Sequence, residues 1–412
     1  MNKSPRLVAL ETLYSIFYDG SYSNIALDKA LSDIKENKAF ISALVYGVTE
    51  KKITLDYFID KYAQGRIKPK VRIVLWLGAY QLLFMDKVPS SASINESVKL
   101  VKEIKQDYYS KLVNAVLHKI DNDRQIPDDL SVKYSVPENL INMWKKQYGE
   151  DVLNEFLPCI NDKPPLFAIP NKKFVNSDEL LYELECDGIL GEAYDEFVLI
   201  ENANDLTDSK AFKNGLFYIE DLSSFNCANA LDALGDDLVL DMCSAPGGKA
   251  FTISQSMNNS GKIYCYDLHE HRLNLIKNSA KRLSIDNIYT DVNDATVYNE
   301  NIPKADKILC DVPCSGFGII RRKPEIRYKD LDSVKDLPQI QYKILETSSR
   351  YLKDGGRIIY STCTLNKKEN ENVVNKFLKD HSGYKLLKDK TMFPSTVGGD
   401  GFYYAIMVKN EN

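Results

Sequence analysis

The sequence contains no apolar run of about 18 residues, the length that a membrane-spanning helix requires. Its first residues, 1–6, lead into an amphipathic stretch instead of the apolar core of a signal peptide. Histidine is scarce, with four residues, and the eight cysteines follow no disulfide framework or zinc-ligand spacing. These absences predict a cytoplasmic protein without membrane contact, structural disulfides or a metal site.

Two common nucleotide-binding motifs are also missing from the glycine-rich turn at 245–249. Gly248-Lys249 is followed by Ala250, where a phosphate-binding loop has Ser or Thr for magnesium. No Gly-x-Gly-x-x-Gly can be placed here, which excludes the dinucleotide fingerprint. The turn still joins an apolar strand to a helix, so its backbone amides can approach a ligand. The ligand is therefore neither a magnesium nucleotide nor a dinucleotide.

Acidic residues stand at the ends of the predicted strands. Asp241 ends the first strand, Asp267 ends the second, Asp294 follows the third and Asp311 ends the fourth. A carboxylate after the second strand suits the hydroxyl groups of a ribose. Four acidic residues without a phosphate-binding Ser or Thr favour a nucleoside with a cationic sulfonium. S-adenosylmethionine (SAM) is that nucleoside.

The second half of the chain alternates strands with helices, which predicts an α/β fold with a doubly wound sheet. Ligands of such sheets bind beyond the carboxyl ends of the strands. The last strand looks like part of an antiparallel hairpin at an edge, and residues 380–400 are predicted to form a loop. The strands are predicted at 238–241, 262–267, 287–291, 307–311, 356–361 and 402–408.

The first half of the chain shows a different pattern. Apolar residues recur at three and four positions from 5 to 121, which predicts a helical bundle around the apolar segment 70–84. An amphipathic helix is expected at 131–147, and short strands surround a helix at 177–185. The predicted organisation is an all-helical domain at 1–125, a linker and helix at 126–160, a small α/β module at 161–225, and the large α/β domain at 226–412.

The net charge of −5 argues mildly against a polyanionic partner, but charge is distributed unevenly. Residues 1–125 contain 19 Lys and Arg against 14 Asp and Glu, an excess of five positive charges. The remaining residues contain 34 against 44, an excess of ten negative charges. Local basic patches would therefore have to supply any contacts with nucleic-acid phosphates.

Four motifs resemble those of RNA cytosine carbon-5 methyltransferases of the Nop/Sun family, and more narrowly the Sun type that acts on small-subunit ribosomal RNA. They are Asp241–Lys249, Asp311–Gly316, Ile320–Glu325 and Ser361–Thr364. The resemblance implies a Rossmann-like core, SAM as cofactor, small-subunit ribosomal RNA as substrate and 5-methylcytidine as product. The family usually has Gln where this chain has Glu220.

The helical region resembles the NusB-type domain that precedes Sun-type enzymes. The similar segments are 77–83, Asn95-Glu96 and 113–117. The resemblance implies contact with RNA or the ribosome. In the family the small α/β module at 161–225 is also used against RNA.

Methyl transfer to carbon-5 of cytosine requires a cysteine, because this carbon becomes nucleophilic only after a thiolate adds to carbon-6. Cys314 and Cys363 both stand at predicted strand ends. In DNA enzymes the Pro-Cys cysteine is the nucleophile, whereas in the RNA family the Thr-Cys cysteine is. By that resemblance Cys363 is the nucleophile and Cys314 assists product release. The alternative is that each is a small buried residue, which we expect of Cys159, Cys186, Cys227, Cys265 and Cys310.

The other site residues are assigned as follows. Asp311 would bind the cytosine ring, with helix capping as its structural alternative, and Lys249 would point into the active site, with a surface lysine as its alternative. Asp267 would bind the ribose and Asp294 the adenine. The cofactor loop is Cys243, Ser244, Ala245, Pro246, Gly247, Gly248 and Lys249, and Asp311 also belongs to the cofactor set. Arg321, Arg322 and Lys323 would clamp substrate phosphates, with Arg327 as a lesser candidate.

One motif and two alternative functions remain. Glu369–Val373 superficially resembles the Glu-Asn-Val of DNA enzymes, but it follows Cys363 instead of Cys314, and we give it no role. The alternative functions are a transfer-RNA methyltransferase with the same chemistry, and a non-catalytic RNA-binding factor in assembly or antitermination. We expect a monomer.

Overall fold

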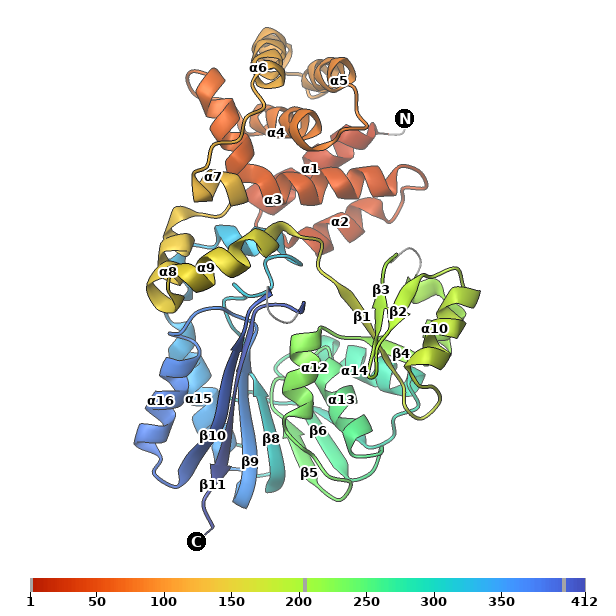
Figure 1. The fold of residues 1–412 in the computed structure, drawn as a ribbon, viewed down its shortest axis with the longest axis vertical. Coiled ribbons are helices and arrows are strands. Elements are labelled where there is room, and N and C mark those ends of the chain that lie inside the picture. The colour runs from red at the N-terminus through yellow and green to blue at the C-terminus, as the bar shows by residue number, and fades with distance from the viewer. Residues whose placement is uncertain (1–2, 203–205, 395–397, 412) are drawn as a thin grey trace. The chain divides into compact units, whose positions relative to one another are not determined.

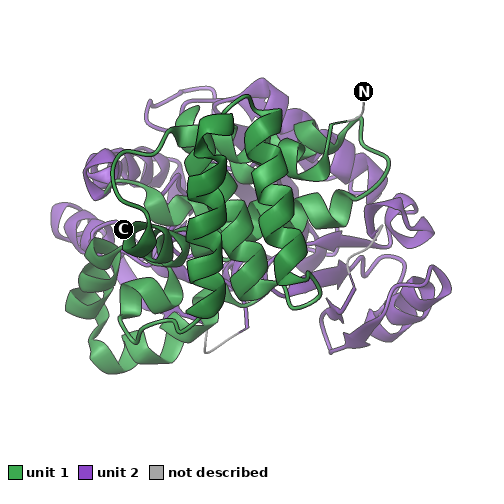
Figure 2. Ribbon diagram, turned by 90° about the horizontal axis from the view of Figure 1, so that it is seen from above, with its two compact units in different colours: residues 1–162, 320–330 green, residues 163–319, 331–412 purple. Residues whose placement is uncertain are grey.

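The computed structural model describes residues 3–202, 206–394 and 398–411. Contacts divide the chain into two compact units (Figure 2). The helical unit comprises residues 1–162 and 320–330, and the α/β unit comprises 163–319 and 331–412. Residues 320–330 are thus an excursion from the α/β part of the sequence into the helical unit. The predicted boundaries had placed them in a contiguous domain at 226–412.

The helical unit is built around α4, which begins at Pro69 and buries ten residues, among them Trp76 and Gly78. This agrees with the apolar segment that the sequence predicts at the centre of a bundle. The helix predicted at 131–147 is interrupted, because Ser135 has a positive φ and Pro137 follows it. The helices are α1 (Pro5–Tyr18), α2 (Ser23–Leu31), α3 (Lys38–Tyr62), α4 (Pro69–Phe84), α5 (Ser90–Glu103), α6 (Ser110–Asn122), α7 (Leu130–Tyr134), α8 (Glu138–Tyr148) and α9 (Glu150–Phe156).

A small antiparallel sheet opens the α/β unit, in the order β2-β3-β1-β4. Helix α10 begins with a capping box between Asn176 and Glu179. Residues 217–219, which lie within the small α/β module predicted at 161–225, complete this small sheet. Its elements are β1 (Leu166–Pro170), α10 (Ser177–Cys186), β2 (Gly191–Ala193), β3 (Val198–Ile200), α11 (Lys210–Lys213) and β4 (Phe217–Ile219).

The large sheet has seven strands in the order β10-β11-β9-β8-β5-β6-β7. The central strands are parallel, and helices cover both faces, with α15 and α16 on one side and α12, α13 and α14 on the other (Figure 1). This confirms the predicted doubly wound α/β core. Its strands are β5 (Leu238–Asp241), β6 (Lys262–Asp267), β7 (Ile288–Val292), β8 (Ala305–Asp311), β9 (Leu352–Thr362), β10 (Tyr384–Met392) and β11 (Phe402–Lys409). Its helices are α12 (Leu222–Asn229), α13 (Gly248–Ser256), α14 (Glu270–Arg282), α15 (Leu337–Ser349) and α16 (Glu371–Asp380).

The prediction of a loop at 380–400 was wrong for most of the segment, because β10 occupies Tyr384–Met392. This strand pairs antiparallel with β11, so β10 forms the edge and β11 lies inside the sheet. Residues 395–397, also within the predicted loop, lie outside the described residues.

The order of the strands sets the position of the site. The chain runs outward from β5 through β6 to β7, and then returns to β8 on the other side of β5. The carboxyl ends of β5 and β8 therefore flank the point where the strand order reverses, which is where ligands bind in open α/β sheets.

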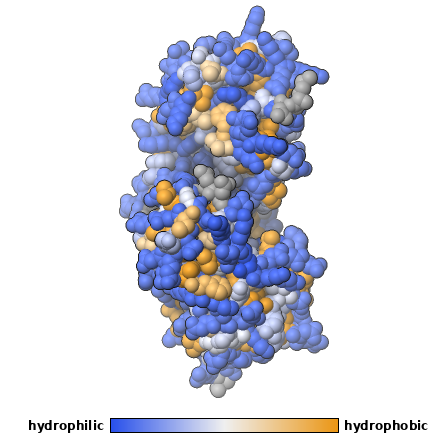
Figure 3. All heavy atoms as spheres, turned by 90° about the vertical axis from the view of Figure 1, so that its right-hand side faces the viewer, coloured by the Kyte–Doolittle hydropathy of each residue, from blue (hydrophilic) through white to orange (hydrophobic). Residues whose placement is uncertain are grey.

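Hydrophilic residues cover most of the face drawn in Figure 3, interrupted by smaller hydrophobic areas. Within the described ranges, we find no helix with both the length and the apolar character needed to cross a membrane.

Candidate active site

The loop after β5 brings backbone atoms close to the carboxyl edge of the sheet. The Ser244 amide donates to the Tyr266 carbonyl on β6 over 2.8 Å, which holds the loop against the neighbouring strand. Gly247 has a φ of 107° and precedes the first residue of α13. A Cβ at Gly247 would lie 2.9 Å from the Phe251 ring, so both conformation and space favour glycine here. The Ala245–Pro246 bond is cis.

A cavity of about 370 Å³ lies beside this loop, within the α/β unit. Asp241, Cys243, Ser244, Ala245, Pro246, Gly248, Lys249 and Asp311 line it, so most of the predicted cofactor loop faces one hollow. The opposite wall comes from segments preceding the large sheet, including Tyr218, Glu220 and Ser224. Apart from the unusual Glu220, no sequence pattern marks the residues of this wall.

Lys249 and Asp311 form an ion pair in the cavity. Lys249 Nζ lies 2.8 Å from Asp311 Oδ2 and donates to Ser224 Oγ over 2.8 Å. The other Asp311 oxygen accepts a hydrogen bond from Ser361 Oγ on β9 over 2.8 Å. Burial opposes the charge, but the Asp311 and Glu220 carboxylates outweigh it and raise the pKa of Lys249. The ammonium thus stays charged and fixes the position of Asp311.

Two carboxyl groups in the cavity wall are strongly perturbed. Burial raises the pKa of Asp241 to about 7 and that of Glu220 to about 7. Among the residues that the structure describes, Asp241 Oδ1 and Ser244 Oγ are buried and have no hydrogen-bond partner. Buried polar atoms without partners are costly, so these two are suited to a polar or cationic ligand. Glu220 Oε2 accepts from Thr252 Oγ1 over 2.5 Å.

The two other predicted cofactor carboxylates lie outside the lining of this cavity. Asp267 ends β6, is 3% exposed, accepts from the His269 amide and forms an ion pair with Arg272 at 3.0 Å. Asp294 is exposed and accepts from the amide and hydroxyl of Thr296. The structure therefore groups Asp241, Lys249 and Asp311 in one hollow but places Asp267 and Asp294 beside other partners.

Cys314 and Cys363 are brought together from loops that follow β8 and β9. Their sulfur atoms lie 3.1 Å apart, and both residues are partly exposed. The hydrogen bond with Cys363, and then burial, raise the pKa of the Cys314 thiol. Either thiol can donate the proton of the hydrogen bond between them. Two thiols at this distance can both react with neighbouring atoms of one bound ligand.

The remaining cysteines only partly match their expected burial. Cys227, Cys265 and Cys310 are buried as expected, whereas Cys159 is partly exposed. Cys186 is exposed, so the prediction that it is buried was wrong. It lies at the end of α10, where the helix turns its last residues to solvent. Among the described residues, no group of three His, Cys, Asp or Glu side chains could hold a metal ion.

The basic segment after the Cys314 loop belongs to the helical unit. Arg327 is 1% exposed, and it donates to the carbonyls of Glu50 and Ser135 and to Asn161 Oδ1 at 2.9–3.1 Å. A guanidinium buried in this way cannot clamp a phosphate, so the interpretation of Arg327 as a phosphate contact was wrong. Arg321 is also buried, at 7% exposure, whereas Arg322 and Lys323 are partly exposed.

Two family models match different parts of the chain. A family model described as 16S rRNA methyltransferase RsmB/F matches residues 228–408, and a NusB family model matches residues 3–122. A Bacillus subtilis (strain 168) protein, named probable ribosomal RNA small subunit methyltransferase B, is 33% identical over 98% of this chain and 99% of its own length.

The similar solved structures include the following two. The crystal structure of PH0851 covers 99% of this chain and 100% of its own, with 27% identity and a TM-score of 0.82. That of NSun6 from Pyrococcus horikoshii with SFG covers 67% of this chain and 99% of its own, with 21% identity and a TM-score of 0.61. The latter likeness shows the fold alone. With its full-length relative and both matching models, this chain belongs to the RsmB/F family of methyltransferases and carries a NusB-family domain in front.

Proposed function

We propose that this protein transfers a methyl group from SAM to carbon-5 of a cytidine in small-subunit ribosomal RNA. The observation that carries the proposal is the 3.1 Å separation of the Cys314 and Cys363 sulfur atoms, at the same sheet edge as Asp311. Cytosine methylation at carbon-5 needs one sulfur to activate the ring and a second group to complete release. A pair of cysteines in the loops after two adjacent strands supplies both.

In the first step the Cys363 thiolate adds to carbon-6 of the cytosine. A sulfur–carbon bond forms, and the electrons of the ring double bond move toward carbon-5 and the ring nitrogen. Asp311, held by Lys249 and Ser361, would accept a hydrogen bond from the exocyclic amine and so orient the cytosine ring for this addition. Carbon-5 then accepts the methyl group, which SAM supplies when bound.

In the last step carbon-5 loses its proton, the double bond re-forms and the Cys363 sulfur leaves as thiolate. Cys314 is suited to accept this proton. The largest cause of its raised pKa is the hydrogen bond with Cys363. Once the Cys363 sulfur is bonded to carbon, that cause is removed, and Cys314 loses its own proton more readily. Cys314 can then act as the base.

The residues around the loop fit SAM. Asp241 Oδ1 and Ser244 Oγ are buried polar acceptors without partners beside a glycine-rich turn, and the adjoining cavity holds about 370 Å³. The loop residues 243–249 would bind SAM through their backbone, with Asp267 at the ribose and Asp294 at the adenine. The NSun6 structure, which shares this fold, was solved with SFG, a SAM analogue, which supports SAM as the cofactor.

For the RNA, the NusB-family domain and the small α/β module are the proposed binding parts. Arg322 and Lys323 are the partly exposed members of the predicted clamp and would contact phosphates. The target cytidine must be single-stranded or extruded from a helix, because carbon-6 cannot reach a sulfur while the base is stacked.

The test is methyl transfer from isotopically labelled SAM to small-subunit ribosomal RNA and, separately, to transfer RNA. We expect label in the ribosomal RNA, converted to a bisulfite-resistant cytidine. Label in transfer RNA alone would mean that transfer RNA is the substrate instead of ribosomal RNA. If neither RNA is labelled, the result would favour a non-catalytic RNA-binding factor. RNA containing 5-azacytidine should trap the enzyme covalently, and peptide mapping should find the bond at Cys363.

A further inference from the structure

A buried hydrogen-bond network lies directly beneath the two cysteines. Glu369 and Asn370, consecutive residues at the start of α16, are both 0% exposed. They lie in the segment whose resemblance to a DNA-enzyme motif had been set aside. Each contacts the residues next to one cysteine, whereas the cysteines themselves are partly exposed. The network is therefore placed to fix the backbone that carries each sulfur.

Glu369 fixes the Cys314 loop. Its Oε2 accepts from the Ser315 amide over 2.8 Å and from Gln341 Nε2 over 2.9 Å, and its Oε1 accepts from Ser315 Oγ over 2.6 Å. Gln341 Nε2 also donates to the Pro313 carbonyl over 3.0 Å. The residues on both sides of Cys314 are thus held by one buried carboxylate and the amide bound to it.

Asn370 does the same for Cys363. Its Oδ1 accepts from Thr362 Oγ1 over 2.6 Å, and its Nδ2 donates to the Thr364 carbonyl over 2.9 Å. A direct bond of 2.7 Å between the hydroxyls of Ser315 and Thr364 then joins the two loops. Because Ser315 donates its hydroxyl proton to Glu369, Thr364 donates in that bond.

We propose that Glu369 and Asn370 are a pair of positioning residues that set the distance and the orientation between Cys314 and Cys363. Hydrogen bonds to a carboxylate are stronger than neutral ones, and the Glu369 and Asn370 side chains each bond directly to the backbone beside one cysteine. Glu369 governs the sulfur that assists release, and Asn370 governs the sulfur that attacks. The two roles of the sulfur atoms rest on the proposed function. The claim that Glu369 and Asn370 set the distance between these atoms rests on geometry alone.

The near-isosteric variants Glu369→Gln and Asn370→Asp test the pair. In Glu369→Gln an amide nitrogen faces two donors and cannot accept from them. In Asn370→Asp a carboxylate oxygen faces the Thr364 carbonyl and repels it. We expect turnover to fall on the order of 100-fold in each, because small displacements of reacting groups cost about that much. Glu371→Gln and Asn372→Asp, two residues further along the chain, are the matched controls and should keep wild-type turnover.

The covalent RNA–enzyme adduct on a denaturing gel separates positioning from general damage. Glu369→Gln should accumulate adduct, because release is impaired, whereas Asn370→Asp should form little, because attack is impaired. If the two residues had a merely structural role, the amount of adduct would change in the same direction in both variants. That result would overturn the proposal. Ser315→Ala removes the hydroxyl that bonds to Glu369 and Thr364 but keeps the bond from the Ser315 amide to Glu369. It should show the Glu369→Gln effect at about one tenth of its size, which keeps the test valid if Glu369→Gln misfolds.

A second measurement needs neither RNA nor SAM. A short bifunctional thiol reagent should link Cys314 to Cys363 in the wild type and in both controls, and peptide mapping should identify the link. The yield should fall severalfold in both positioning variants. Unchanged yield in those variants would overturn the proposal. If the yield falls but the wild type forms no RNA adduct, the proposed function fails while the positioning role stands.

Discussion

At the residue scale, the sulfur pair separates two roles that the sequence alone assigned by resemblance. The hydrogen bond to Cys363 and burial raise the pKa of the Cys314 thiol. In the proposed mechanism Cys363 is the sulfur that attacks, and Cys314 is the group that assists release. The two roles predict opposite behaviour of the two alanine variants.

Cys363→Ala should lose RNA methylation by roughly a thousandfold or more, because the ring can no longer be activated. SAM binding, measured by calorimetry, should persist, since Cys363 lies outside the described lining of the cofactor cavity. Cys314→Ala should instead accumulate a covalent RNA adduct on a denaturing gel. Full activity of Cys363→Ala, or a missing adduct in Cys314→Ala, would reverse or remove the assigned roles.

Glu220 gives a prediction for pH. Burial first raises its pKa from 4.5 to about 7, so between these values the folded state keeps a proton that the unfolded state has lost. The free energy of unfolding must therefore fall as the pH rises through this window, by about 3 kcal/mol at most. Glu220→Gln cannot titrate and should lack this component.

The measurement is thermal unfolding of both proteins between pH 5 and pH 8. The melting temperature of Glu220→Gln relative to wild type should rise with pH. Glu192→Gln, at an exposed position of the same unit, is the control and should follow the wild type. A constant difference between Glu220→Gln and wild type across the range would show that Glu220 does not titrate there.

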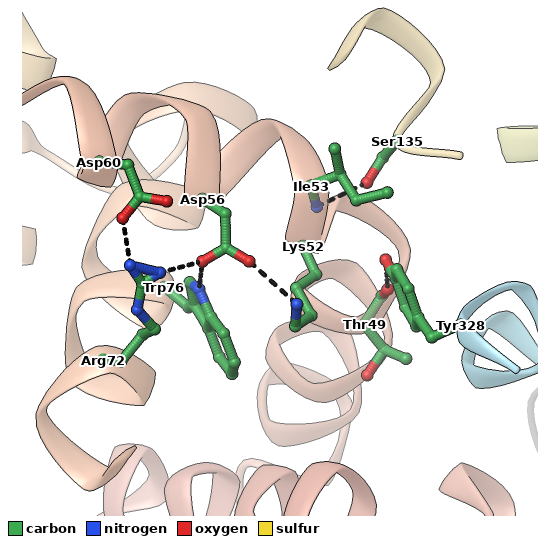
Figure 4. A network of polar contacts seen from close by, with 9 residues as sticks. All are labelled: Thr49, Lys52, Ile53, Asp56, Asp60, Arg72, Trp76, Ser135 and Tyr328. Carbon is green, nitrogen blue, oxygen red and sulfur yellow. Dashed lines mark hydrogen bonds and ion pairs between the residues drawn. The ribbon is translucent and has the colours of Figure 1, made fainter. Parts of the chain in front are cut away.

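At the element scale, the segment 320–330 is held by contacts within the helical unit. Tyr328 donates to the Thr49 carbonyl over 2.7 Å and packs edge-on against Phe17, next to the Asp56 network (Figure 4). On the same segment, Glu325 accepts from the amide and hydroxyl of Ser23. Side-chain contacts of this kind bind the segment to α2 and α3.

Truncating Tyr328 should therefore loosen the segment. Tyr328→Phe loses one hydrogen bond and should cost about 1 kcal/mol, whereas Tyr328→Ala also leaves a cavity and should cost about 3–5 kcal/mol. Hydrogen exchange of the full chain should show faster exchange at Pro324–Tyr328 and in α3 for the Ala variant. Tyr108→Ala, at a side chain that is 91% exposed, is the control. Equal exchange in Tyr328→Ala and wild type would mean that Tyr328 does not hold the segment.

Elements with a strong local pattern could be predicted from the sequence. Strands β5, β6, β8 and β11 have apolar runs, and the structure has them within two residues of the predicted bounds. Strand β10 was missed because it is an edge strand with charged residues such as Lys388 and Asp389, so no apolar run marks it. The role of Ser224 beside Lys249 has no local signal, since spatial proximity creates it. Glu369 lies in the Glu369–Val373 motif, so the sequence did mark it. Because this motif was compared with that of DNA enzymes, it was given no role.

At the scale of the whole molecule, the chain crosses between the two units three times. The crossings follow Asp162, Ile319 and Asp330. The second comes only a few residues after Cys314, and the intervening loop is fixed by hydrogen bonds of Gly318 with Cys363 and Gly401. A contiguous domain at 226–412 was the natural prediction, because packing between residues far apart in the chain leaves no local pattern. The helical unit thus incorporates chain that belongs in sequence to the catalytic domain.

This connectivity predicts that the helical unit remains bound after the backbone is cut. With a protease site placed between Asp162 and Lys163, the cleaved fragments 1–162 and 163–412 should elute together in gel filtration, because residues 320–330 of the second fragment stay packed in the helical unit. Tyr328→Ala removes a central contact of that packing and should weaken co-elution, whereas Tyr328→Phe should retain it. Separation of the wild-type fragments at once after cleavage would show that 320–330 does not hold the helical unit. If they stay together, methylation activity should also survive the cut, since the chain after Cys314 keeps its anchor.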